Sequence, residues 1–196
     1  MMDAVPWLFL IPPLTVTALA VGAIAYTRTG RGRARKHLRA GGQAVYGAAL
    51  DDAEREFAAG LALAPDHAGL LGAMGSLLCS QDRFTEALPM LERARTADPK
   101  DFRLSVLIGT CQAGTGDVSA AKTTWAAIPK TSDAYLEGQQ LLAQVHEQAG
   151  ELAAALACLE AGIESATTLQ ARDARREIRR LKKEIAAGGD GAATSS

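Results

Sequence analysis

Histidine and cysteine are the residue types most able to bind a metal or attack a substrate, and this chain of 196 residues has three of each. The histidines lie far apart and lack the H-E-x-x-H spacing that brings two imidazoles to one zinc ion. The cysteines are too few and too scattered for a zinc site or a disulfide framework. The chain also lacks a Walker A loop, a G-x-G-x-x-G turn and a G-x-S-x-G elbow. We therefore expect no cofactor, no metal and no enzymatic activity. The three histidines and three cysteines are His37, His67, His146, Cys79, Cys111 and Cys158.

The charges are segregated along the chain, although 21 Lys and Arg nearly balance 22 Asp and Glu. Residues 28–39 carry six cations and no acid, residues 40–171 carry eight cations and seventeen acids, and residues 172–184 carry seven cations and three acids. An acidic body therefore lies between two basic ends. Because the body is acidic and no aromatic platform accompanies the first basic run, we do not expect nucleic acid as a partner.

Residues 5–26 contain no charged side chain and follow a short N-terminal tail, residues 1–4. As a helix they would measure about 33 Å, enough to cross a hydrocarbon core of about 30 Å. Trp7 and Tyr26 stand near the ends, where aromatic side chains favour the membrane interface. The adjacent prolines at 12 and 13 predict a kink, which spanning helices tolerate. The segment is predicted to be one transmembrane helix, followed by a basic juxtamembrane linker over residues 27–33.

The alternative for this segment is a cleaved signal peptide, because Ala23-Ile24-Ala25 resembles a cleavage site. The leading residues carry Asp3 and no cation, the reverse of a signal peptide, which favours the uncleaved anchor. Cations directly after a span keep that side in the cytoplasm, and they also attract anionic lipid. We therefore expect the N-terminus outside and the body in the cytoplasm. The membrane-proximal cations are Arg28, Arg31, Arg33, Arg35, Lys36 and Arg39.

The rest of the chain repeats residue types every 34 positions. Alanine recurs with this spacing, a large apolar residue follows each alanine four positions later, and a small residue precedes each alanine by twelve. Several positions that agree on one period indicate a repeat architecture. In that order, the positions are Ala53, Ala87, Ala121 and Ala155; Phe57, Leu91, Trp125 and Leu159; Gly41, Gly75, Gly109 and Ala143.

The pattern resembles the tetratricopeptide repeat family, whose 34-residue unit reads W-x2-L-G-x2-Y, then A-x3-F, then P. The second repeat matches best, with Leu71, Gly75 and Leu78 followed by Ala87 and Pro99. The resemblance implies an all-α fold, a right-handed α-solenoid of about four helix pairs that bury their apolar faces against one another. The domain is predicted over residues 34–169, with repeats 34–67, 68–101, 102–135 and 136–169.

The resemblance also implies details of each hairpin. The small residue of the first helix is expected to let the alanine of the second helix approach closely. Asp51, Thr85 and Ser119 fall where the second helices should have their N-caps. Gly116 and Gly150 suit turns that need a positive φ.

Two segments depart from the regular repeat. Pro129 predicts that the second helix of the third repeat ends near Ile128, with a loop through Ser132 that is either a hinge or a simple length adjustment. Residues 170–187 are predicted to form a C-terminal capping helix, because an apolar stripe opposes its Arg and Lys. The alternative is that this basic face contacts anionic lipid or an acidic partner. Residues 188–196 are rich in Gly, Ala and Ser and are predicted to be disordered.

In this family the first helices of the repeats line a concave groove that binds partner peptides. Most of the corresponding side chains here are small, so an extended segment or a helix should fit, and the Lys, Arg and Asn clamp for chaperone C-termini is absent. The fourth repeat has five Glu and no Lys or Arg, which predicts a partner with a basic segment. The groove positions are Gly42, Tyr46, Gly72, Ser76, Cys79, Ser80, Val106, Thr110, Ala113, Gln140, Gln144 and Glu147.

The layout predicts a membrane-anchored scaffold or adaptor that binds partner proteins and assembles or regulates a membrane complex. It is similar to the anchored tetratricopeptide repeat adaptors of lipopolysaccharide assembly, but their C-terminal Cys-x2-Cys metal module is absent. The Ala- and Arg-rich composition favours a bacterial inner membrane. Two alternatives remain: a periplasmic tetratricopeptide repeat assembly factor, or a non-autonomous regulatory subunit of a membrane enzyme.

Overall fold

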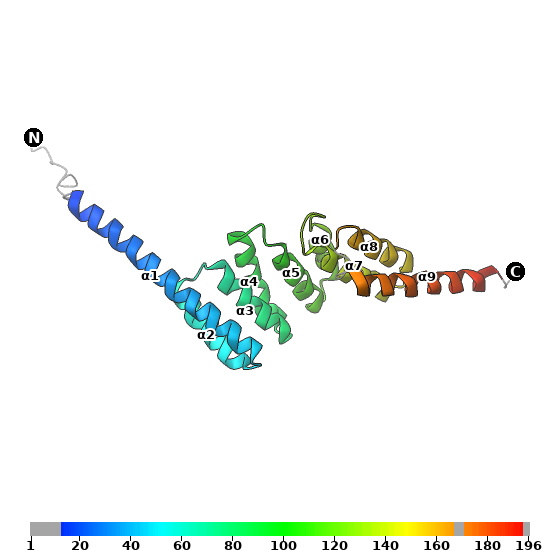
Figure 1. Ribbon diagram of the computed structural model, residues 1–196, viewed down its shortest axis with the longest axis horizontal. Helices are drawn as coiled ribbons and strands as arrows, with labels where there is room; N and C mark the ends of the chain where they lie inside the picture. The colour runs from blue at the N-terminus through cyan, green and yellow to red at the C-terminus, as the bar shows by residue number, and fades with distance from the viewer. Residues whose placement is uncertain (1–12, 167–170, 194–196) are drawn as a thin grey trace, which may run out of the picture. The chain divides into compact units, whose positions relative to one another are not determined.

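The computed structural model describes residues 13–166 and 171–193, with side chains over residues 30–166 and 171–187. Throughout these ranges the chain forms helices joined by turns and contains no strand (Figure 1). It divides into two compact units, residues 1–73 and 74–196, and the boundary falls inside α3 (Ala68–Ser80). The all-helical class implied by the family resemblance is confirmed for the described residues.

The first unit contains α1 (Pro13–Tyr46), which packs against α2 (Leu50–Leu63) as a hairpin. Residues 27–33, predicted to be a linker, instead continue α1 without a break. Arg and Ala favour the helix strongly enough to carry it through Gly30 and Gly32. The part of α1 that packs on α2 is therefore the end of a helix that begins in the predicted anchor.

The predicted membrane anchor is only partly covered. The tail 1–4 and residues 5–12 of the anchor lie outside the described residues, while residues 13–26 form the start of α1. Within the described part, no helix combines the length and the apolar character needed to cross a bilayer.

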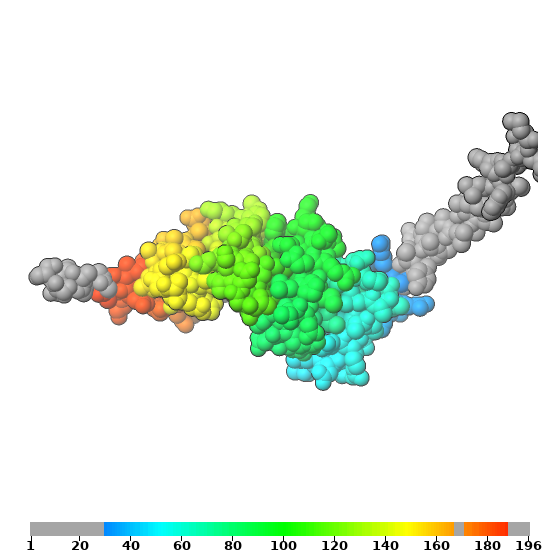
Figure 2. Space-filling model, turned by 180° about the vertical axis from the view of Figure 1, so that it is seen from behind, coloured from blue at the N-terminus to red at the C-terminus, as the bar shows by residue number. Residues whose placement is uncertain are grey.

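The second unit continues from α3 as a series of helices in which sequence neighbours pack together. Figure 1 shows α5 and α6, then α7 and α8, as successive hairpins. Helix α9 packs against α8 of the last hairpin. In Figure 2 the coloured part of α9 reaches past the end of that hairpin. The helices after α3 are α4 (Phe84–Ala97), α5 (Phe102–Gly114), α6 (Val118–Ala126), α7 (Tyr135–Gln148), α8 (Leu152–Glu164) and α9 (Ala171–Ala193).

Each of the first three hairpins closes on a pair made of a glycine and a large side chain sixteen residues later. A Cβ on Gly109 would lie 2.3 Å from Trp125 Nε1, and a Cβ on Gly75 would lie 2.6 Å from Leu91 Cγ. A Cβ on Gly41 would meet the Phe57 ring in the same way. The missing Cβ makes room for the large residue. The prediction gave this role to the alanine, and at Gly75 the Ala87 carbonyl oxygen would also lie 3.5 Å from the added Cβ.

Trp125 shows how tightly this pair is fitted. Its side chain is buried, and Nε1 donates a hydrogen bond of 3.1 Å to the Val106 carbonyl on the facing helix. Ala121, Ile128 and Tyr135 complete the cluster around the ring. A buried indole N–H needs such an acceptor, and only the glycine surface lets the ring reach it.

The turns inside the hairpins repeat the period in their backbone conformation. Gly116 and Gly150 have φ of +93° and +77°, as predicted. Ala48 and Asp82 hold the equivalent positions with φ of 58° and 59°, although they carry a Cβ. The turn geometry is therefore set by the hairpin, and glycine only relieves its strain.

The predicted N-caps are wrong. Helices α2, α4 and α6 are capped by Ala49, Arg83 and Asp117, two residues before the predicted positions. The apolar residue that opens each of these helices already has helical geometry, so Asp51, Thr85 and Ser119 lie in the first turn. At Asp117 the side chain does cap, because it accepts a hydrogen bond of 3.0 Å from the Ala120 N–H.

Two helix ends also differ from the prediction. Helix α6 ends at Ala126, two residues before Ile128, and a turn closed by the Ser132 N–H on the Pro129 carbonyl leads toward α7. Helix α9 runs to Ala193, so it enters the segment predicted to be disordered. Alanines on both sides of the glycines there favour continued helix.

We predict that Gly109→Ala destabilises the chain by about 1–3 kcal/mol, because the new methyl group displaces Trp125 and costs it the Val106 hydrogen bond. Gly42→Ala is the control, since a Cβ there meets no atom within 4 Å and alanine favours a helix. Urea unfolding followed by circular dichroism measures both. Equal stability of the two variants would contradict the packing described here.

Candidate functional site

The predicted groove positions are divided between the two units. Gly42, Tyr46 and Gly72 belong to the first unit, where the Tyr46 side chain is 98% exposed. All other predicted positions, from Ser76 to Glu147, belong to the second unit.

Two of the predicted groove residues do not reach the surface. Cys79 and Val106 are buried, and Val106 belongs to the core around Trp125. Helix α5 packs against both α4 and α6, so little of its circumference remains for solvent. The family register predicted which side of the helix these residues occupy, but it could not predict how much of that side is covered.

The hydroxyl groups near these positions already have partners. Ser80 Oγ donates to the Leu77 carbonyl at 2.7 Å, and Thr110 Oγ1 donates to the Val106 carbonyl at 3.0 Å. Both bonds stay within one helix. In this part of the predicted groove the side chains are therefore small, and their hydroxyl groups already donate within their own helices.

The fourth hairpin and α9 form a hollow in the second unit. Gln140, Gln144 and Glu147 recur along one side of α7 and line a cavity of about 320 Å³. Its apolar lining comes from Ala143, Leu159 and Ala174, and two further carboxylates, Asp173 and Glu177, come from α9. The three α7 residues were predicted as groove residues, whereas the contribution of α9 was not.

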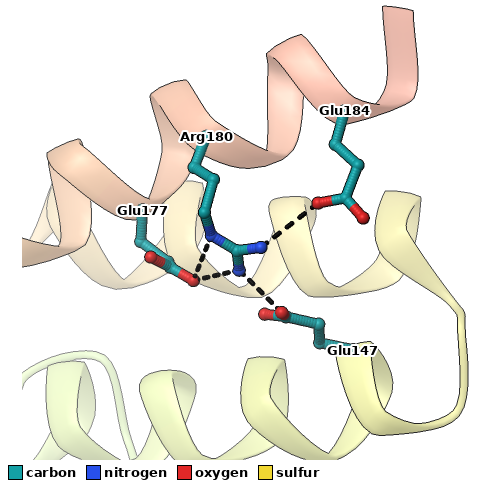
Figure 3. Close-up of polar contacts among 4 residues, drawn as sticks. All are labelled: Glu147, Glu177, Arg180 and Glu184. Atoms are coloured by element: carbon teal, nitrogen blue, oxygen red, sulfur yellow. Dashed lines mark hydrogen bonds and ion pairs between the residues drawn. The ribbon is translucent and has the colours of Figure 1, made fainter. Parts of the chain in front are cut away.

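Arg180 of α9 contacts three carboxylates (Figure 3), and two of them, Glu147 and Glu177, line this hollow. Its guanidinium donates to Glu147 at 2.7 Å, to Glu184 at 3.1 Å and to Glu177 through Nε at 3.1 Å. The hydrogen bond from Arg180 lowers the pKa of Glu177 below its usual value. The same bonds raise the pKa of Arg180, so the group stays ionised.

The acidity of the fourth repeat is largely neutralised within the chain. Four of its five glutamates pair with cations of the same chain, and the fifth, Glu137, makes no ion pair with a described residue. The basic segment expected to dock at this end is thus partly supplied by α9 itself. The pairs are Glu147 with Arg180 at 2.7 Å, Glu151 with Lys122 at 4.0 Å, Glu160 with Lys182 at 2.8 Å, and Glu164 with Lys130 at 3.9 Å.

The sequence contains a signal for the contact between α9 and the last hairpin. A repeat with five Glu is followed directly by a helix with seven cations, and segments of opposite charge that adjoin along a stack are expected to pair. The apolar stripe of α9 then faces the hairpin, with Ala171, Ala174, Ile178 and Leu181 buried.

The first unit has a basic surface on α1. Arg31, Arg33, Arg35, Lys36 and Arg39 are exposed there, while the side chain of Arg28 lies outside the described ones. Three of these cations border a hollow together with Leu38 and His67.

The histidines and cysteines form no chemical site in the described part of the chain. No group of three metal-binding side chains occurs there. His37 and His146 each pair with a glutamate, Glu56 and Glu151, and His67 Nδ1 accepts from the Leu70 N–H at 3.3 Å. Burial raises the pKa of the Cys111 thiol to about 12, so the nucleophilic thiolate does not form at neutral pH.

Comparisons with known proteins agree with this architecture. Residues 78–137 match the family model described as tetratricopeptide repeat. No curated protein matches the chain. The matched segment runs from the end of α3 to the start of α7.

Solved structures show the same fold over more of the chain. YrrB, described as a TPR protein with an unusual peptide-binding site, is 20% identical and aligns over 89% of this chain and 92% of its own, with a TM-score of 0.61. MamA from Desulfovibrio magneticus is 19% identical over 67% of this chain and 75% of its own, also with a TM-score of 0.61. The O-GlcNAc transferase of Thermobaculum terrenum is 18% identical and aligns over 69% of this chain and 26% of its own, with a TM-score of 0.62.

We predict that Arg180→Gln loosens α9, because Glu147, Glu177 and Glu184 then lose their shared cation. Hydrogen exchange of the α9 amides should become faster at neutral pH. Arg179→Gln is the matched control, since Arg179 is exposed and makes no ion pair in the described part of the chain. Equal exchange in the two variants would show that the apolar stripe alone holds the helix.

The same contact predicts a pH dependence. A carboxyl whose pKa is lowered in the folded state stabilises the fold above its unfolded pKa, near 4.5 for Glu177, and this contribution disappears as the pH falls through the folded value. Protection of α9, corrected for the intrinsic exchange rate, should therefore decrease below about pH 4.5, and Arg180→Gln should reduce that decrease. An unchanged pH profile in this variant would argue against the contact.

Proposed function

We propose that this chain is a non-enzymatic scaffold that binds a segment of a partner protein in the hollow formed by α7, α8 and α9. The observation that carries the proposal is the arrangement of amides and carboxylates around an apolar lining at the end of a repeat stack. Small, mostly apolar hollows with a few placed polar groups are typical of binding sites. The peptide-binding site named for the structural neighbour YrrB supports the same use of the fold.

The chemistry of the hollow indicates the kind of segment that fits. The amides of Gln140 and Gln144 can both donate to and accept from the backbone of an extended peptide. Ala143, Leu159 and Ala174 provide room for an apolar side chain. Asp173 makes no ion pair in the described part of the chain, so it is available for a basic side chain. The proposed ligand is a short segment with adjacent apolar and basic residues.

The proposal includes a membrane anchor at residues 5–26, with the repeats in the cytoplasm of a bacterium and the anchor in its inner membrane. Its support is the uncharged stretch and the six cations that follow it. The continuity of α1 fits this arrangement, because one helix then leads from residue 13 into the first hairpin. Such a scaffold would keep a partner near the bilayer.

We predict that carbonate washing leaves the full-length chain in the membrane fraction. A reporter that is active only outside the cytoplasm should be inactive when fused after Ser196. The control is the same reporter placed before residue 5, which should be active. Release by carbonate would refute the anchor, and an active C-terminal fusion would indicate a periplasmic body.

We predict that a photo-crosslinking residue at position 144 captures a partner in intact membranes, whereas one at the exposed position 123 on α6 does not. The triple variant Gln140→Ala, Gln144→Ala, Asp173→Asn should reduce partner recovery at least about tenfold, equivalent to about 1.4 kcal/mol. Circular dichroism checks that it remains folded. Capture that is equal from both positions, or that survives the triple substitution, would place the binding site elsewhere.

A further inference from the structure

The outward face of α9 carries an unbroken stripe of cations. Arg172, Arg176, Arg179 and Lys183 follow the spacing i, i+4, i+7, i+11, which places them along one side of a helix over about 16 Å. All four side chains are exposed. None of them makes a hydrogen bond or ion pair with another residue of the described chain. The stripe is therefore a row of positive charges that the fold leaves available.

The opposite face of α9 fixes the direction of this stripe. Ala174, Ile178 and Leu181 are buried against the last hairpin. Arg180 and Lys182 add ion pairs to Glu147 and Glu160, which belong to that hairpin. Because the helix is held on this side, it presents the four cations to solvent without needing to rearrange.

The acidic residues of α9 up to residue 187 do not cancel the stripe. Glu177 and Glu184 lie on the flank of the helix, where Arg180 pairs with both. Asp173 lies on the same flank and borders the hollow. Arg180 thus partly neutralises two carboxylates near the stripe, and it also holds α9 in place.

We propose that the α9 stripe docks on an anionic lipid surface. A row of cations complements a plane of phosphate headgroups, and juxtamembrane basic helices bind acidic lipids in this way. The outward face carries no apolar side chain larger than alanine up to residue 187, so it lacks the apolar anchors that form the centre of a protein–protein interface. This favours the lipid surface over an acidic protein. The proposal adds a second membrane contact to the scaffold, but it rests on α9 alone.

The test uses the full chain reconstituted into vesicles of phosphatidylcholine, with or without phosphatidylglycerol. A donor fluorophore is attached at Ala186→Cys, at the exposed end of the stripe, and acceptor-labelled lipid marks the bilayer. Cys158→Ala removes the half-buried thiol, and Cys79 and Cys111 are buried. Energy transfer then reports whether α9 lies on the membrane.

We expect stronger transfer in the vesicles with phosphatidylglycerol, and its loss in 1 M salt, where charges are screened beyond about 3 Å. Replacing Arg172, Arg176, Arg179 and Lys183 by Gln should lower the ratio of docked to undocked α9 roughly 1,000-fold. The control replaces four cations of the same unit that lie outside α9 by Gln and should keep the transfer. These are Lys100, Arg103, Lys122 and Lys130.

Transfer that is independent of phosphatidylglycerol, or that persists in the stripe variant, overturns the proposal. If transfer is independent of lipid charge, and crosslinking in intact membranes captures an acidic protein that the stripe variant does not capture, the stripe is a protein-binding surface and the proposal is wrong. Flotation with phosphatidylcholine vesicles tests the anchor separately, because the anchor does not need anionic lipid. Failure of the anchor and failure of the stripe are therefore distinguishable.

Discussion

The fold depends on the contact between a glycine of one helix and a large side chain of the next. In the three hairpins where glycine occupies this position, the space of the missing Cβ is filled by Phe57, Leu91 or Trp125. The contact brings two helices close enough to exclude water from their apolar faces. Because each hairpin is too small to bury those faces alone, the contact must recur along the stack. The sequence has a 34-residue period because each hairpin needs the same small and large residues at the same positions.

The last hairpin has no following repeat, and α9 takes that place by a different kind of interaction. Its apolar stripe covers the hairpin as another repeat would, but ion pairs of Arg180 and Lys182 reinforce the contact. Individually, exposed ion pairs contribute little to stability. Their effect here is on position, since they orient α9 so that Asp173 and Glu177 complete the hollow and the basic stripe faces outward. The end of the stack is thus where both proposed binding surfaces are formed.

The sequence was sufficient to predict the repeats but not their surfaces. The recurring small and large residues predicted the hairpins because their packing requires those volumes at that spacing. Gly116 and Gly150 predicted two turns, yet Ala48 and Asp82 adopt the same positive φ without a glycine to signal it. Burial of Cys79 and Val106 depends on helices brought in from other repeats, which no local pattern records. The role of Arg180 likewise depends on how α9 is turned relative to α7.

The central claim is that a partner protein binds at the hollow between α7, α8 and α9. Hydrogen exchange of the full-length chain, measured alone and in complex with the captured partner, tests it most directly. The account predicts that the partner slows exchange in α7 and the first turns of α9, with little change in α4 and α6. Protection confined to α4 and α6, with α7 and α9 unchanged, would contradict it.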